Sequence, residues 1–219
     1  SNNHRHNYLV NLLAKICDEL WVVQEYKKPS IHKNSGTFQD SKIMKNYFNF
    51  VDTAQEKIFK KNFIKHNSKN IKILSIPYLK LNNLSLSHLD NFLKSDIYIV
   101  FGSSYIKGNL INFLIANKAI NIHAGVSPYY RGTDCNFWAL YDDNPHLVGS
   151  TIHLLSKGLD SGPILYHAMS KIKTDPFEYS MSCVKSAFHS IAERIRDKSI
   201  LEIKPVEQNR NDEKNKFSY

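Results

Sequence analysis

Strand-like apolar runs alternate with helical segments through the first two thirds of this 219-residue chain, and this alternation constrains the fold most strongly. The runs "IKILSIP", "DIYIVFGSS" and "AINIHAG" predict strands, and residues 97–101 are apolar throughout, as in a strand buried on both faces. A short strand is predicted over residues 20–23, and helices over residues 5–19 and 40–63 and within "SLSHLDNFLKS" and "KGNLINFLIANK". The alternation predicts an α/β domain with a Rossmann-like, mainly parallel sheet flanked by helices.

The last third has a different pattern. Two strand-like runs, "LVGSTIHLL" and "GPILYHAMSKI", enclose the turn-rich "SKGLDS", and a long helix follows with Asp175 as its cap and Pro176 in its first turn. Residues 27–39 are predicted to form a loop. We expect a single domain over residues 1–207 and a loose, polar tail over residues 208–219.

The beginning of the chain departs from the usual α/β order. A nucleotide-binding α/β domain normally starts with a buried strand, whereas this sequence starts with "SNNHRHN" and a helix. Either the sheet has one strand fewer, or a first strand precedes the given sequence, and we favour the second interpretation.

Composition limits the class of protein. Hydrophobic residues make up 42% of the chain, which is enough for a core, and no apolar run reaches the roughly 18 residues of a membrane span. Three scattered cysteines and the absence of a secretion signal indicate a cytoplasmic protein without a cysteine metal site, and we expect no metal. The net charge of +9 comes from dispersed lysines, which is typical of a solvated basic surface, although such a field also favours a polyanionic ligand.

Three polar loops follow predicted strands, at the sheet edge where α/β proteins bind ligands: "FGSSYIKG", "NIHAGVSPYYRG" and "KGLDSGPI". Asn121 and His123 are two residues apart on a strand, so their side chains share a face. The amide and a protonated imidazole can donate to an oxyanion, and Asp160 can orient the histidine or a water. Taken singly, the histidine also fits a structural role, and the aspartate fits a turn.

These residues also form a recognisable pattern. "NIHAGVSPYYRG" followed by "VGSTIHLLSKGLDSGPIL" resembles the formyltransferases that use 10-formyltetrahydrofolate. That family includes glycinamide ribonucleotide transformylase, methionyl-tRNA formyltransferase and amino-sugar N-formyltransferases. The resemblance covers residues 96–166 and implies the formyltransferase fold, 10-formyltetrahydrofolate as formyl donor, and Asn121, His123 and Asp160 as catalytic residues.

The resemblance implies further binding residues in the loops around these three. The folate would lie against Ser104, Tyr105, Ile106, Lys107, Leu155, Ser156, Gly158 and Leu159, and the acceptor against Arg131, Gly132, His4 and Arg5. Tyr105 and Ile106 equally fit ordinary packing, and Arg131 equally fits a brace for its loop. His4 and Arg5 equally fit a solvated helix start. We assign His153 to the core or the surface rather than to catalysis.

The acceptor is expected to be a primary amine on a small molecule. The segment after Ile164 lacks the barrel domain of methionyl-tRNA formyltransferases, which argues against nucleic acid, and "SNNHRHN" lacks the glycine-rich phosphate loop of the glycinamide enzyme. "SPYYRG" and "NHRHNYL" are most similar to the sugar branch, which implies an amino-deoxysugar on a nucleotide carrier. Glycinamide ribonucleotide formyltransferase, formyltetrahydrofolate hydrolase and a non-catalytic folate- or nucleotide-binding module remain alternatives. No membrane partner is expected, and a homodimer is left open.

Overall fold

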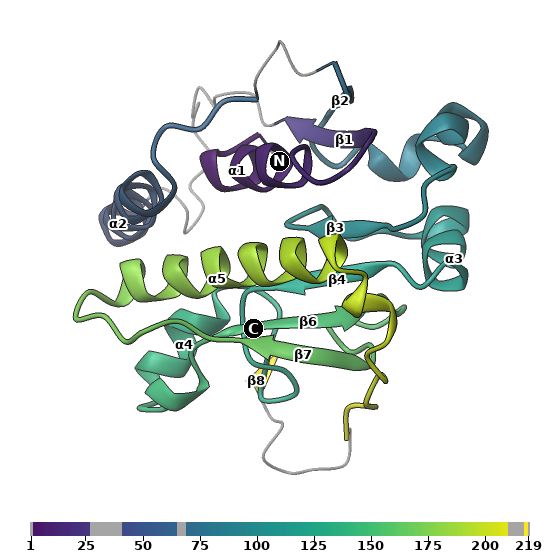
Figure 1. The fold of residues 1–219 in the computed structure, drawn as a ribbon. Coiled ribbons are helices and arrows are strands. Elements are labelled where there is room, and N and C mark those ends of the chain that lie inside the picture. The colour runs from purple at the N-terminus through teal and green to yellow at the C-terminus, as the bar shows by residue number, and fades with distance from the viewer. Residues whose placement is uncertain (1, 27–40, 65–68, 210–216, 219) are drawn as a thin grey trace.

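The computed structural model describes residues 2–26, 41–64, 69–209 and 217–218. Helices and strands alternate as the sequence predicts, and the α/β class is confirmed (Figure 1). The first half contains α1 (His4–Leu13), β1 (Leu20–Tyr26), α2 (Lys42–Phe59), β2 (Ile71–Pro77), the 3-10 helices η2 (Leu81–Asn83) and η3 (Leu86–Leu93), β3 (Ile99–Phe101) and α3 (Gly108–Ala116). The second half contains β4 (Ile120–His123), β5 (Tyr130–Arg131), α4 (Cys135–Tyr141), η4 (Pro145–Leu147), β6 (Ser150–Leu154), β7 (Ile164–Ala168), α5 (Pro176–Arg196), η5 (Ser199–Leu201) and β8 (Phe217–Ser218).

The strands form separate sheets rather than one continuous sheet. β1 and β2 pair in parallel, and a second sheet has the order β3-β4-β6-β7. Within the second sheet only β3 and β4 are parallel, because β6 and β7 join through antiparallel pairs. The backbones of β5 and β8 pair in parallel. The predicted parallel sheet is therefore confirmed for β1–β2 and β3–β4, and the last two strands make the fold mixed.

One strand differs in burial from the prediction. We expected residues 97–101 to be buried on both faces, yet β3 spans only Ile99–Phe101 and all three residues are half-buried. The physical reason is that β3 pairs with β4 alone among the described strands, so its other edge is open.

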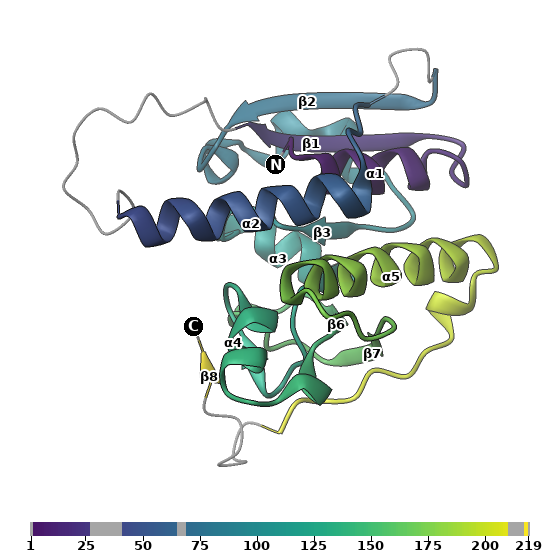
Figure 2. The ribbon, with the colours of Figure 1, turned by 90° about the vertical axis from the view of Figure 1, so that its left-hand side faces the viewer.

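Two hydrophobic clusters cover opposite faces of the strands. The first gathers α1 and α5 with one face of β3 and β4 and includes Leu9, Ile122, Phe188 and Ile191. The second lies beneath η3 and α3. The buried positions of α5 recur every three or four residues, and α5 packs against α1, α2, β6 and β7 (Figure 2).

Local contacts explain where the helices end. α1 stops at Leu13 rather than near residue 19, because the Asn70 side chain donates to the carbonyls of Ala14 and Cys17 at 2.8 and 3.0 Å. The hydroxyl of Ser41 accepts from Met44 N–H and caps α2, and Asp175 caps α5 as predicted.

The loop predicted at 27–39 lies outside the described residues. None of the described helices is long and apolar enough to cross a bilayer.

Candidate active site

The carboxylate of Asp160 lies at the centre of a cluster of polar side chains. Its Oδ1 accepts a hydrogen bond from Asn121 Nδ2 at 3.1 Å. Its Oδ2 accepts from Gly132 N–H at 3.1 Å and lies 3.3 Å from His123 Nδ1. Asn121 and His123 leave the same face of β4, as their spacing predicts, and Asp160 comes from the β6–β7 loop. The structure therefore brings the three predicted side chains together.

His153 belongs to this cluster, although the sequence analysis assigned it to the core or the surface. β6 pairs with β4 in the register that places His153 opposite Asn121. His153 Nε2 lies 2.9 Å from Asn121 Nδ2, and its Nδ1 lies 2.8 Å from the Leu154 carbonyl. Since a carbonyl only accepts, Nδ1 carries the proton and Nε2 accepts from Asn121. His153 is buried as expected, but its ring fixes the orientation of the Asn121 amide.

The ring of His123 is buried and has contacts at both nitrogens. Nδ1 faces Asp160, and Nε2 lies 2.9 Å from the Tyr130 carbonyl. Burial lowers the pKa of His123, and the opposing effects of the Asp160 carboxylate and the Tyr130 carbonyl do not offset it. Both neighbours are acceptors, so the ring donates to one of them when it is neutral and to both when it is protonated.

Asp160 is ionised in the same surroundings. Burial by itself raises the pKa of a carboxyl, but contacts with His153, His123 and Gly132 N–H hold the pKa of Asp160 below its usual range. A neutral imidazole in contact with a carboxylate can accept a proton, because the negative carboxylate stabilises the imidazolium that forms.

Two further contacts hold the Asp160 loop in place. Gln208 Nε2 donates to the carbonyls of Asp160 and Gly162 at 3.0 and 2.7 Å. Arg131 Nε in turn donates to Gln208 Oε1 at 3.1 Å, so Arg131 braces its surroundings. The expectation of a loose tail was wrong at Gln208, which is only 6% exposed, because its amide bonds the loop backbone. Gly162 has no room for a side chain, since a Cβ there would lie 1.8 Å from the Leu154 carbonyl oxygen.

Two of the predicted folate-binding residues have structural partners. The N–H and hydroxyl of Ser104 both donate to the buried carboxylate of Glu25 at 2.7 Å. Leu155 N–H donates to the Ala119 carbonyl, and the side chains of Leu155 and Ile106 pack in the second cluster. These contacts hold the two loops on the sheet, and they leave neither Ser104 N–H nor Leu155 N–H available for a ligand.

The remaining residues of the two predicted folate loops lie at the surface, next to each other. The Tyr105 hydroxyl donates to the Lys157 carbonyl and links the loops. Tyr105 and Leu159 are 52% and 47% exposed, and Lys107 and Gly158 are also exposed. Ser156 Oγ lies 3.0 Å from Ser161 Oγ. An exposed aromatic ring and an exposed leucine on two linked loops fit one face of a flat heterocycle.

The two acceptor-binding candidates on α1 point in different directions. His4 lies against Asn62 and Phe63, with Nδ1 3.1 Å from the Asn62 carbonyl, and makes no described contact with the cluster. Arg5 points toward α5, where its guanidinium lies 3.8 Å from Met181 Sδ. Burial lowers the pKa of Arg5, opposed by the nearby charge of Asp134. Asp134 lies two residues after Gly132, so the charge that acts on Arg5 belongs to the loop that donates to Asp160.

The sequence analysis gave no role to Glu25, which holds the Ser104 loop, or to Gln208, which holds the Asp160 loop, and it placed His153 outside the site. His153 had no local signal, because its place opposite Asn121 depends on the register between β4 and β6. Glu25 and Gln208 had none, since a glutamate in a strand and a glutamine in a polar segment carry no pattern. Within the described ranges, no group of three or more His, Cys, Asp or Glu side chains is arranged to hold a metal ion.

Comparison with known proteins agrees with this geometry. The family described as formyl transferase matches residues 85–195, slightly more than half of the chain. The methionyl-tRNA formyltransferase of Finegoldia magna is 30% identical over 53% of this chain and 37% of its own length. The bifunctional polymyxin resistance protein ArnA of Wigglesworthia glossinidia brevipalpis is 30% identical over 63% of this chain and 21% of its own length. The matched part of the chain thus covers 37% or less of the length of each of these two relatives.

Solved structures are similar in fold. The phosphoribosylglycinamide formyltransferase of Streptococcus pneumoniae matches with a TM-score of 0.53 at 14% identity, over 91% of this chain and 96% of its own. The formyltransferase PseJ of Anoxybacillus kamchatkensis matches with a TM-score of 0.51 at 18% identity, over 88% of this chain and 82% of its own. The matched segment includes every member of the Asp160 cluster on β4, β6 and the β6–β7 loop. The chain belongs to the formyl transferase family.

Proposed function

We propose that this protein transfers a formyl group from 10-formyltetrahydrofolate to a primary amine, and that the amine belongs to an amino-deoxysugar on a nucleotide carrier. The observation that carries the proposal is the Asp160 carboxylate held between Asn121, His123 and Gly132 N–H. Family membership supports formyl transfer, and the PseJ structure was solved with tetrahydrofolate and a UDP-linked formamido sugar.

The folate would lie against the paired loops around Tyr105 and Lys157. Tyr105 and Leu159 are exposed on these loops, and Leu159 directly precedes Asp160, which supports a flat ligand bound next to the cluster. When bound, the donor supplies an activated formyl carbon to the attacking amine. Formyl transfer then needs a donor for the oxygen that gains negative charge and an acceptor for the proton that the amine loses.

The cluster contains groups suited to both tasks. Asn121 is half-buried, and its amide nitrogen can turn one hydrogen from His153 or Asp160 to a substrate oxygen. The His123 ring can take up the proton at the nitrogen that lacks a hydrogen, and the Asp160 carboxylate in contact with it stabilises the resulting charge. Removal of one oxyanion donor typically raises a barrier by about 2.7 to 4 kcal/mol, which is the loss expected for Asn121.

Arg5 supports a phosphorylated acceptor. Its Nε is buried without a hydrogen-bond partner among the described residues, and its guanidinium lies near the Gly132–Asp134 loop. A buried guanidinium with unused donors is well suited to bind a phosphate of a nucleotide carrier. Glycinamide ribonucleotide also has a phosphate and remains the second candidate, since the S. pneumoniae enzyme has a similar fold.

A product screen tests this proposal. The protein is incubated with 10-formyltetrahydrofolate and, separately, UDP- and dTDP-linked amino sugars, glycinamide ribonucleotide, methionyl-tRNA or water, and products are identified by mass spectrometry. We expect one formyl group on an amino-sugar nucleotide. Formate released in water alone would identify a hydrolase, and no product with any acceptor would leave only a binding module. Asp160→Asn serves as the inactive control, and Asp197→Asn, at an exposed carboxylate, as the matched active one.

A further inference from the structure

The side chain of Asn82 bonds the backbone of the first predicted folate loop, residues 104–107, on both sides of Ile106. Asn82 Nδ2 donates to the Tyr105 carbonyl at 2.8 Å, and Asn82 Oδ1 accepts from Lys107 N–H at 2.8 Å. A carbonyl and the N–H two residues later are the pair that an extended segment presents to one residue of a parallel neighbour. One amide side chain therefore takes the place of a strand partner for this loop.

The turn that carries Asn82 is itself well anchored. Leu81, the residue before it in η2, is only 6% exposed and packs in the second hydrophobic cluster, as does Ile106. Leu84 N–H donates to the Leu81 carbonyl at 3.2 Å and closes the turn. Asn82 thus presents its amide from a fixed position, and the 104–107 loop is the part that this amide orients.

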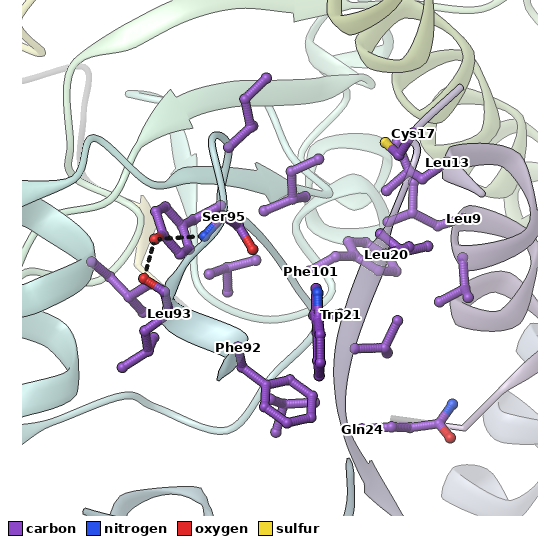
Figure 3. A pocket seen from close by; sticks show the side chains of 18 of the residues that line it. Leu9, Leu13, Cys17, Leu20, Trp21, Gln24, Phe92, Leu93, Ser95 and Phe101 are labelled. Atoms are coloured by element: carbon purple, nitrogen blue, oxygen red, sulfur yellow. Dashed lines mark hydrogen bonds between the residues drawn. The ribbon is translucent and has the colours of Figure 1, made fainter. Parts of the chain in front are cut away.

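The side chain of Ile106 is directed toward the interior. It lines a cavity of about 640 Å³ between β1 and β3, whose walls also include Trp21 and Phe101 (Figure 3). Because Asn82 occupies one edge of the loop, the N–H and carbonyl of Ile106 lie on the opposite edge. Among the described residues neither group has a hydrogen-bond partner. The contacts with Asn82 therefore decide which edge of the loop stays open.

The same contact helps to orient the exposed ring of Tyr105. Asn82 holds the Tyr105 carbonyl, and the Tyr105 hydroxyl donates to the Lys157 carbonyl of the second predicted folate loop. Lys107 Nζ lies 5.6 Å from the centre of the ring. Tyr105 is therefore held at its backbone and at the far end of its side chain, and loss of the Asn82 amide would release the backbone end.

Asn82 comes from outside the segment that matches the formyl transferase family, which begins at residue 85. Glu25, which holds Ser104, lies outside that segment as well. The 104–107 loop lies inside the segment, whereas these two side chains that hold it come from the preceding part of the chain. The segment shared with the family therefore does not by itself fix the shape of the loop.

We propose that Asn82 is a positioning residue for the formyl donor, and that it acts through the backbone of the 104–107 loop. This role rests on the proposed function, because the donor is taken to be a folate bound against that loop. A loop that is held in its bound shape beforehand loses less conformational freedom on binding, which raises affinity. The hydrogen bonds of the Asn82 side chain reach only Tyr105 and Lys107, so its effect falls on donor binding and not on the Asp160 cluster.

Binding of folinic acid, measured by calorimetry, tests this role without any acceptor. Asn82→Leu keeps the size of the side chain and removes both hydrogen bonds, so its Kd for folinic acid should rise about tenfold. Asn83→Leu, at the exposed neighbour in η2, is the matched control and should bind like the wild type. Asn82→Asp still accepts from Lys107 N–H and loses only the donor to the Tyr105 carbonyl, so its Kd should rise about threefold.

Turnover separates positioning from general damage. With the acceptor identified by the product screen, KM for 10-formyltetrahydrofolate should rise about tenfold in Asn82→Leu, whereas kcat at saturating donor should stay within about twofold of the wild type. If Asn82→Leu does not fold, Asn82→Asp decides, because it keeps the shape of the side chain.

Two outcomes would overturn the role of Asn82 alone. One is an equal Kd for folinic acid in the wild type and in the Asn82 variants, and the other is a loss of kcat that persists at saturating donor. A wild-type protein that binds no folinic acid would instead refute the proposed function, and the role of Asn82 with it.

Discussion

The Asn121 amide nitrogen lies 2.9 Å from His153 Nε2, across the antiparallel pair of β4 and β6. This contact exists because the Leu154 carbonyl keeps a proton on the other ring nitrogen. His153 therefore acts on the candidate site through Asn121, and its Nε2 also lies 3.7 Å from Asp160 Oδ1.

Replacement of His153 tests this positioning role. His153→Phe should lower kcat roughly tenfold, because Asn121 loses a hydrogen bond worth about 0.5 to 1.5 kcal/mol. His153→Gln, whose amide oxygen can still accept, should recover much of the loss. Steady-state kinetics with saturating donor and acceptor measure both, and His146→Gln, at an exposed position, is the control. Equal losses in the Phe and Gln variants would show that the ring only fills space.

The buried His123 ring predicts how stability changes with pH. Because the pKa of His123 is lowered in the folded protein, the unfolded state takes up a proton first, near pH 6.5. The free energy of unfolding should therefore fall as the pH drops from 7.5 to 5.5, by at most about 1.4 kcal/mol per pH unit from this residue. Urea unfolding of the wild type and His123→Gln measures the effect. A slope that persists unchanged in His123→Gln would assign it to another group.

Arg5 predicts a selective effect on acceptor binding. Arg5→Met should raise KM for the acceptor roughly tenfold, because a phosphate loses a charged hydrogen-bond donor, while KM for the folate donor stays the same. Arg196→Met, at the exposed end of α5, is the matched control. A parallel rise in both KM values would indicate a general disturbance of α1 instead.

Gln208 predicts a structural effect on the Asp160 loop. Gln208→Ala removes the hydrogen bonds to the Asp160 and Gly162 carbonyls and should lower the free energy of unfolding by about 1 to 3 kcal/mol. Glu207→Ala changes the exposed neighbour and should have little effect. Chemical denaturation compares the two, and equal stabilities would show that the tail residue does not hold the loop.

The sequence predicts local features of this fold better than it predicts long-range contacts. The alternation of strands and helices, the Asp175 cap and the shared face of Asn121 and His123 all follow from spacing and residue type. The role of His153 depends on the register between β4 and β6, which no local pattern contains. The burial of Gln208 likewise depends on carbonyls of a distant loop. The half-buried state of β3 follows from the open edge beside it, which hydrophobicity alone does not show.

Asp160→Asn provides the most direct test of the central claim that one carboxylate organises formyl transfer. The substitution preserves the size of the side chain and removes its charge, so transfer to the acceptor in a single turnover should slow by about 100- to 10,000-fold, while the melting temperature stays near that of Asp197→Asn. A folded Asp160→Asn protein that transfers the formyl group at the wild-type rate would contradict the account.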